Sequence, residues 1–201
     1  MSEPARHRVP LRERKQQRAR QAIVEAALAL FAERGFDAVT VSDIAERAEV
    51  GRSTFFRYFG DKQEVLFADD HRAQLAEQLA VQAATGPAIG DSLPAALFYV
   101  RSLVLSTVEI ITSEPDGYEL HERLVAQHPE LRARSLSKHR AYARTLVDLL
   151  VSHGAERATA TLAAEFGLAC YYAGHAADGD DPRRLRGAVD AAFARLGSLR
   201  P

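Results

Sequence analysis

Apolar side chains recur three and four positions apart along most of the chain, whereas alternating apolar and polar positions never extend beyond a few residues. The first spacing belongs to one face of an α-helix, and the second belongs to a β-strand. We therefore predict an all-α protein of about nine helices. The predicted helices span roughly residues 12–34, 40–48, 52–58, 62–84, 91–113, 117–127, 129–153, 155–177 and 182–197.

Residues that favour helix ends support these boundaries. Gly35 follows the first helix, where it tolerates the left-handed conformation of a C-terminal cap. Thr40 and Asp43 have the spacing of an approximate capping box at the start of the second helix. Asp181 precedes Pro182, which is an N-cap followed by a proline at the first helical position.

The segment AEVGRSTFFRYFGDK, residues 48–62, combines aromatic and basic side chains in a span too short to form its own core. Two short helices joined by a three-residue turn have the spacing of a helix-turn-helix, whose second helix enters the DNA major groove. Phe55 and Phe59 can pack with Ile44 and Phe31 on one face. The remaining side chains then face outward and suit groove reading: Arg52, Ser53, Thr54, Phe56, Arg57 and Tyr58. The alternative is a compact helical subdomain with a solvated basic face.

Charge is distributed unevenly, although the net charge is only −1. Residues 1–20 carry seven Lys and Arg against two Glu, and residues 1–62 carry twelve basic against nine acidic side chains. Residues 63–201 carry fourteen basic against eighteen acidic side chains. This asymmetry favours contact between the N-terminal part and a polyanion, although residues 1–19 could also be an inert basic arm.

Residues 20–66, RQAIVEAALALFAERGFDAVTVSDIAERAEVGRSTFFRYFGDKQEVL, resemble the tetracycline-repressor (TetR) family of bacterial transcription regulators. The shared pattern is Phe-x-x-x-Gly-Phe, then Thr-Val-x-x-Ile-Ala, then Thr-Phe-x-x-Tyr-Phe-x-x-Lys. The resemblance implies a DNA-binding domain at 20–62, after the arm at 1–19. It also implies a helical ligand-binding and dimerisation domain at 63–201.

The resemblance also implies roles in DNA binding. Thr40 caps its helix beside the DNA backbone, Ser42 reaches a base or phosphate, and Tyr58 and Lys62 hold phosphates. The recognition helix is lined by Arg52, Ser53, Thr54 and Arg57. The chain departs from the family at two positions: Glu49 replaces a glycine in the turn, and Phe56 replaces a common tyrosine.

The two last predicted helices suit a dimer. The helix at 155–177 is apolar on two sides and carries small residues, and the helix at 182–197 has bundle spacing. Two such helices from each of two chains would form a four-helix bundle, as the resemblance also implies. An ordinary core helix in a monomer is the alternative. The predicted interface residues are Ala164, Gly167, Leu168, Tyr171, Leu185, Val189, Ala192, Phe193 and Leu196.

Large side chains in the C-terminal part are candidates for an apolar ligand pocket, although a filled core has the same composition. These candidates are Phe67, His71, Phe98, Leu124, Tyr142 and Phe166. The resemblance implies that a ligand shifts the helix beginning at Lys62 and so releases DNA. His71, His121 and His175 could line such a pocket, but structural or surface histidines are more common.

Motifs for other chemistry are missing from the sequence. It contains no dinucleotide or phosphate-loop motif and no Gly-x-Ser-x-Gly, and position 125 is Val where a zinc-protease motif beginning at His121-Glu122 needs histidine. We expect no cofactor, no metal and no enzymatic activity. Cys170, the one cysteine, reads as a buried apolar residue, and the acidic run 178–181 reads as a turn and cap.

The sequence therefore predicts a homodimeric DNA-binding regulator, more plausibly a repressor, which a small and largely apolar ligand releases from a palindromic operator. The two half-sites would be about 34–36 Å apart or a multiple of that. We expect a cytoplasmic protein, without a membrane span or export. A helical small-molecule carrier and a helical enzyme are the alternatives.

Overall fold

The computed structural model describes residues 11–68, 80–82 and 84–198. All regular elements within these ranges are helices, which confirms the predicted all-α class. The chain divides into two compact units, Met1–Asp70 and His71–Pro201. The predicted boundary between residues 62 and 63 falls inside a short helix that packs on the first helix, so this helix belongs to the N-terminal unit.

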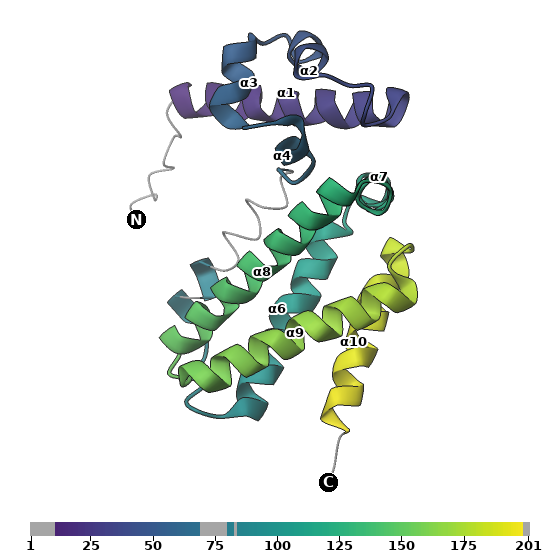
Figure 1. The fold of residues 1–201 in the computed structure, drawn as a ribbon. Coiled ribbons are helices and arrows are strands. Elements are labelled where there is room, and N and C mark those ends of the chain that lie inside the picture. The colour runs from purple at the N-terminus through teal and green to yellow at the C-terminus, as the bar shows by residue number, and fades with distance from the viewer. Residues whose placement is uncertain (1–10, 69–79, 83, 199–201) are drawn as a thin grey trace, which may run out of the picture. The chain divides into compact units, whose positions relative to one another are not determined.

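Four helices form the described part of the N-terminal unit: α1 (Leu11–Arg34), α2 (Val41–Arg47), α3 (Arg52–Tyr58) and α4 (Lys62–Leu66). In Figure 1, α2 and α3 lie above α1 and α4 lies below it. Gly35 has a φ of 78° and donates its N–H to the Phe31 carbonyl, so it ends α1 as predicted. The side chains buried at the centre of this unit include Ile23, Leu30, Phe31, Ile44, Phe55 and Val65.

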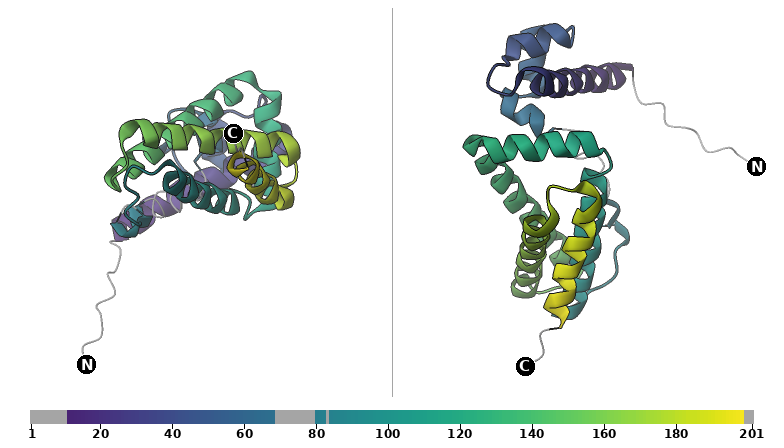
Figure 2. Two further views of the ribbon diagram at one scale, coloured as in Figure 1. Left: turned by 90° about the horizontal axis from the view of Figure 1, so that it is seen from below. Right: turned by 90° about the vertical axis from the view of Figure 1, so that its right-hand side faces the viewer.

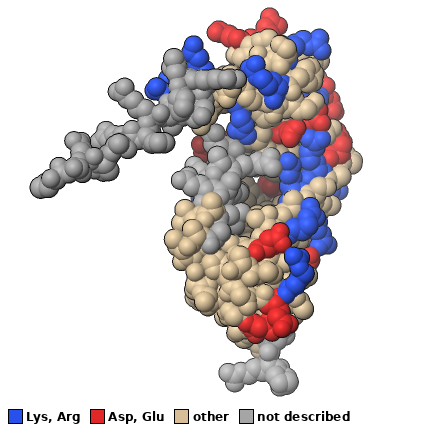
Figure 3. Space-filling model, turned by 90° about the vertical axis from the view of Figure 1, so that its left-hand side faces the viewer, with Lys and Arg blue, Asp and Glu red and all other residues tan. Residues whose placement is uncertain are grey.

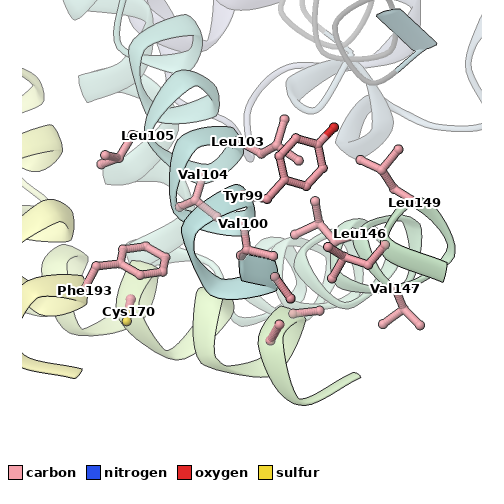
Figure 4. Close-up of a cluster of buried hydrophobic side chains, with 14 of the residues drawn as sticks. Tyr99, Val100, Leu103, Val104, Leu105, Leu146, Val147, Leu149, Cys170 and Phe193 are labelled. Atoms are coloured by element: carbon pink, nitrogen blue, oxygen red, sulfur yellow. The ribbon is translucent and has the colours of Figure 1, made fainter. Parts of the chain in front are cut away.

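The described part of the C-terminal unit contains α6 (Leu93–Ile111), α7 (Pro115–Gln127), α8 (Pro129–Ser152), α9 (Arg157–Asp178) and α10 (Pro182–Gly197). Helix α9 packs against α6, α8 and α10, as Figures 1 and 2 show. Figure 4 shows the core that results. Leu103 and Val104 from α6 meet side chains from α8, together with Cys170 from α9 and Phe193 from α10.

Close packing of α9 against α10 depends on glycine. A Cβ atom added to Gly174 of α9 would lie 2.6 Å from the backbone of Val189 in α10, a distance that real Cβ atoms do not reach. Burial raises the pKa of the Cys170 thiol, which agrees with its predicted role as a small core residue. Asp181 caps α10 by accepting a hydrogen bond from the Arg183 N–H, also as predicted.

The predicted helix at 62–84 is wrong in its continuity, because α4 ends at Leu66 and Phe67 and Ala68 are not helical. Residues 65–68 are all buried, and four consecutive buried residues would surround a helix rather than occupy one side of it. The chain therefore turns here, and the Ala68 carbonyl accepts a hydrogen bond from the Arg20 guanidinium.

Helix α6 is long and apolar enough to cross a membrane by length and composition, with a mean hydropathy of 1.5. Its buried side chains pack against α9 and α10, which is the environment of a core helix in a folded domain. Basic and acidic side chains interleave on the face of the protein shown in Figure 3. Within the C-terminal unit, ion pairs join helices, including Arg101 with Asp190 and Arg140 with Glu165.

Candidate nucleic-acid interface

The start of α2 is fixed by a reciprocal cap. The Thr40 side chain accepts a hydrogen bond from the Asp43 N–H, and the Asp43 carboxylate accepts one from the Thr40 N–H at 2.7 Å. The Thr40 hydroxyl also donates to the Asp43 carboxylate, and this hydrogen bond together with the one from the Thr40 N–H lowers the pKa of Asp43. The predicted capping box is thus confirmed, and it leaves Thr40 and Ser42 exposed beside one another.

The turn between α2 and α3 contains a strained residue. Glu49 has a φ of 53°, in the left-handed region where a side chain is unfavourable. Its N–H donates to the Glu46 carbonyl, and the Val50 N–H donates to the Ala45 carbonyl, so the chain must turn at this point. The glycine that the resemblance implies at this position would adopt this conformation without strain.

Helix α3 has a buried side and an exposed side. Phe55 is fully buried and Phe59 nearly so, with ring centres 5.7 Å apart. Phe56 is 50% exposed and meets the Phe55 ring edge-on. The predicted inward position of Phe55 and Phe59 and outward position of Phe56 are confirmed, whereas Tyr58, predicted to face outward, is half-buried with its ring beside that of Phe59.

The predicted contact residues lie at the start of α2, along α3 and at the first residue of α4. Thr54, Tyr58 and Lys62 are half-buried, and the Arg57 guanidinium stacks 5.1 Å from the centre of the Tyr58 ring. This stacking holds the flexible Arg57 side chain in one direction. The exposed members of the set are Thr40, Ser42, Arg52, Ser53, Phe56 and Arg57.

Lys62 has an internal role that its sequence position did not reveal. Its ammonium donates to the Phe36 carbonyl at 2.7 Å and the Val39 carbonyl at 2.9 Å, and it lies 3.5 Å from the Asp37 carbonyl. The ammonium also stands 4.3 Å from the centre of the Phe36 ring. Because a lysine has three donors, these contacts use its hydrogen-bonding capacity and attach α4 to the loop between α1 and α2.

Two other basic side chains are also engaged within the unit. Arg20 was counted in the basic N-terminal region, but its guanidinium binds the Ala68 carbonyl and lies 5.6 Å from the centre of the Phe59 ring. Arg47 binds both carboxylate oxygens of Glu33, at 2.6 and 2.7 Å, and lowers the pKa of this carboxyl. Residues 1–10 of the basic arm lie outside the described residues.

Five of the six predicted pocket residues are described, and they differ in burial and in the unit to which they belong. Phe98 is 71% exposed, so its predicted inward orientation is wrong. Tyr142 and Phe166 are half-buried, and the Tyr142 hydroxyl lies 2.7 Å from that of Thr107. Leu124 is buried on α7 and Phe67 is buried in the N-terminal unit, whereas His71 lies outside the described residues.

The residues predicted for the dimer interface lie mainly in the chain's own core. Leu185 and Val189 are fully buried, and Ala164 and Gly167 are buried where α9 meets α6. Leu168 and Phe193 are buried too, while Tyr171, Ala192 and Leu196 are half-buried against the core. The packing that their periodicity indicated is therefore contact between α9, α10 and α6 of one chain.

Sequence reasoning missed a polar cluster in the C-terminal unit. The Glu122 carboxylate of α7 accepts a 2.7 Å hydrogen bond from His175 of α9 and lies 3.1 Å from the Nδ1 atom of His121. The sequence contains two signals: the pair His121-Glu122, which is an incomplete zinc motif, and the histidines His121 and His175, which could line a pocket but are more commonly structural or surface residues.

Residues 23–68 match the family described as bacterial regulatory proteins, tetR family. The chain is 31% identical over 134 residues to the uncharacterized HTH-type transcriptional regulator YdeS of Bacillus subtilis (strain 168), covering 67% of this chain and 65% of that protein. It is 47% identical over 55 residues to the HTH-type transcriptional regulator TcmR of Streptomyces glaucescens, covering 27% of this chain and 24% of TcmR. These matches span less than two thirds of either relative.

The fold is also similar to that of Thermus thermophilus FadR, a TetR family transcriptional repressor solved with lauroyl-CoA. The TM-score is 0.57 with 23% sequence identity, over 90% of this chain and 96% of the other.

Proposed function

Because the chain belongs to the tetR family of bacterial regulatory proteins, we propose that it is a sequence-specific DNA-binding regulator of transcription. One observation carries this proposal. Phe55 anchors α3 from within, while Arg52, Phe56 and Arg57 extend from its other side into solvent. A folded protein has no internal use for this exposed aromatic and basic face.

The dimensions and chemistry of α3 suit the major groove. Its seven residues form a rod about 10 Å long and, with side chains, about as wide as the groove. Arg52 and Arg57 supply guanidinium forks for guanine or phosphate, and the Phe56 ring suits the methyl group of thymine. Nearby residues of α2 and α3 add hydroxyl groups that can bind phosphate or bases: Ser42, Ser53, Thr54 and Tyr58. The Thr40 hydroxyl instead donates to Asp43.

Binding of duplex DNA by the purified protein tests the proposal. Duplexes are first selected from a random pool, and affinity for the selected duplex is then measured by fluorescence anisotropy at increasing salt. We expect a near-palindromic site and an affinity that falls steeply with salt. Arg57→Ala should weaken binding, whereas Arg144→Ala, an exposed arginine on α8, should bind as the native protein does. The proposal would be overturned if the selected duplexes shared no sequence, or if Arg57→Ala bound the selected duplex as tightly as the native protein.

A two-fold dimer would present two copies of α3 to the two halves of such a site. The outward sides of α9 and α10 support this part of the proposal. They carry small or apolar exposed residues at intervals of three, four and seven positions, which lie on one side of a helix, and Leu162 is 44% exposed. This outward stripe consists of Leu162, Ala169 and Ala173 of α9 with Ala191 and Ala194 of α10. It replaces the core residues first predicted for the interface.

The proposed function is that of a cytoplasmic repressor, which a small effector releases from DNA. The effector binds among the helices of the C-terminal unit and acts by its different affinity for the DNA-competent and released states. Lys62 supports such coupling within the N-terminal unit, since it attaches the start of α4 to the loop that precedes α2. Transcription from a promoter that carries the selected site, measured with and without the protein, distinguishes repression from activation.

A further inference from the structure

Six polar and aromatic side chains from three helices form one cluster, here called the Glu122 cluster. The Glu122 carboxylate and the His175 imidazole join α7 to α9. The Nδ1 atom of His139 on α8 lies 3.3 Å from the Tyr172 hydroxyl, and its ring meets the Tyr171 ring edge-on with centres 5.2 Å apart. The members of the cluster are His121, Glu122, His139, Tyr171, Tyr172 and His175.

The charge state of the cluster at neutral pH follows from these contacts. Burial opposes ionisation of Glu122, but hydrogen bonds from His121 and His175 overcome it and lower the pKa of Glu122 to about 2. Burial lowers the pKa of His139 to about 4, so this imidazole is neutral. The hydrogen bond to Glu122 raises the pKa of His175. The cluster thus holds an ionised Glu122 carboxylate. The imidazole of His175, which hydrogen-bonds to it, carries a compensating positive charge only when it is protonated.

Two polar groups of the cluster are left without a hydrogen bond among the described residues. The Tyr171 hydroxyl has none, although burial raises the pKa of this phenol. The Nε2 atom of His139 has none either. Tyr171 and His139 are half-buried, so these two atoms are available to a polar group that enters the cluster.

The cluster can be reached from solvent. The side chains of Glu122, His175 and His121 are 19%, 35% and 26% exposed to solvent. A small molecule can therefore approach the carboxylate, although Glu122 lies between α7 and α9.

We propose that the Glu122 cluster binds the ammonium group of a small organic amine, which is the effector of the regulator proposed above. An ammonium group has three donors, and the cluster offers three acceptors: the Glu122 carboxylate, the Tyr171 oxygen and His139 Nε2 when Nδ1 donates to Tyr172. The aromatic rings of Tyr171 and Tyr172 also favour a cation. An anion would be repelled by Glu122, and a neutral group would leave its charge uncompensated.

The amine competes with a proton on His175. Protonated His175 compensates the charge of Glu122, and an ammonium group takes over this function when His175 is neutral. Amine affinity should therefore rise as the pH increases through the pKa of His175. The groups that influence this exchange are Tyr118, His121 and Glu122 of α7, His139 of α8, and Tyr171, Tyr172, His175 and Asp180 of α9 and the turn after it.

Calorimetry on the full chain tests the proposal with three probes that share a phenyl ring: phenethylamine, phenethyl alcohol and phenylpropionate. We expect phenethylamine to bind most tightly, with an affinity about tenfold higher near pH 8 than near pH 6. Glu122→Gln should weaken amine binding about tenfold or more. The control Glu119→Gln, which removes the same charge from an exposed site on α7, should bind like the native protein.

Equal or tighter binding of phenylpropionate, native affinity in a folded Glu122→Gln protein, or no binding of phenethylamine would each overturn the inference. If Glu122→Gln does not fold, NMR titration of the native protein replaces it. Saturating phenethylamine should then lower the pKa of His175, because the bound ammonium group disfavours a second positive charge nearby. An unchanged pKa would contradict the inference. Operator binding is measured on the same preparations. If the protein binds DNA but not the amine, only this inference is contradicted. If it binds the amine but not DNA, the proposal that it is a DNA-binding regulator is contradicted.

Discussion

Lys62 donates a 2.7 Å hydrogen bond to the carbonyl of Phe36, and its ammonium faces the ring of the same residue at 4.3 Å. Phe36 follows α1 and Lys62 begins α4, so this pair joins the two ends of the segment that contains α2 and α3. The lysine that a sequence comparison would assign to phosphate therefore also has a structural role.

Lys62→Ala should lower the free energy of unfolding by about 1–3 kcal/mol, because it leaves the Phe36 and Val39 carbonyls without their charged donor. Urea denaturation followed by circular dichroism measures the change. Lys15→Ala, at an exposed position of α1, should change stability by less than about 0.5 kcal/mol. If Lys62→Ala keeps the stability of the native protein but loses DNA binding, the role of Lys62 is phosphate contact instead.

Glu49→Gly should stabilise the protein by roughly 0.5–1 kcal/mol. Glycine relieves the left-handed φ of 53° at this position, and this gain exceeds its greater entropy in the unfolded chain. Glu46→Gly removes the same charge from within α2 and should instead destabilise by about 1 kcal/mol. Thermal unfolding of the two variants compares the signs, and a loss of stability in Glu49→Gly would contradict the argument.

The helices could be predicted well where local residues mark their ends. The predicted span 182–197 matches α10, because Asp181 and Pro182 specify its start by local hydrogen bonding and by a fixed φ. Glu49 occupies a turn position where the resemblance implies a glycine, and its left-handed φ of 53° gives the physical reason for that preference. By contrast, α4 ends where tertiary contacts bury consecutive residues, and no local signal marks that point.

Helical periodicity shows that a residue is buried, but it does not show against what. Leu185 and Val189 were therefore assigned to a partner chain, whereas they pack within their own. Helix α6 is apolar on most sides, so the sequence could not tell that Phe98 faces outward. The contacts of Lys62 with backbone carbonyls and the meeting of Glu122 with His175 depend on the path of the chain, which single-sequence patterns do not encode.

Adjacent phenylalanines on α3 should respond in opposite ways to truncation. Phe55→Ala should cost about 3–5 kcal/mol of stability, because this ring is fully buried. Phe56→Ala should change stability by less than about 0.5 kcal/mol and should weaken DNA binding, since its half-exposed ring contributes to the outward face. Denaturation and anisotropy on both proteins separate the effects. Native DNA affinity in Phe56→Ala would remove this residue from the interface.

Leu162→Glu should convert the proposed dimer to a monomer, because it places a charge within the apolar outward stripe of α9. Sedimentation velocity measures the mass in solution. Leu136→Glu provides a matched control, since Leu136 of α8 is exposed to a similar extent, 49%, but lies outside the stripe. If both variants keep the mass of the native protein, the interface lies elsewhere.

Stability should fall as the pH decreases from about 6.5, and His139 should cause part of this fall. Burial holds the pKa of His139 at about 4 in the folded protein, against 6.5 for an ordinary histidine. Between these values the unfolded chain binds a proton that the folded chain does not, so acidification favours unfolding. His139→Gln should reduce the slope of stability against pH between about 5 and 6.5, as measured by urea denaturation at each pH. This window lies above the range in which protonation of Glu122 contributes, because its pKa falls from 4.5 to about 2 on folding. Identical slopes in the native protein and the variant would show that His139 gains its proton as readily in the folded chain as in the unfolded one.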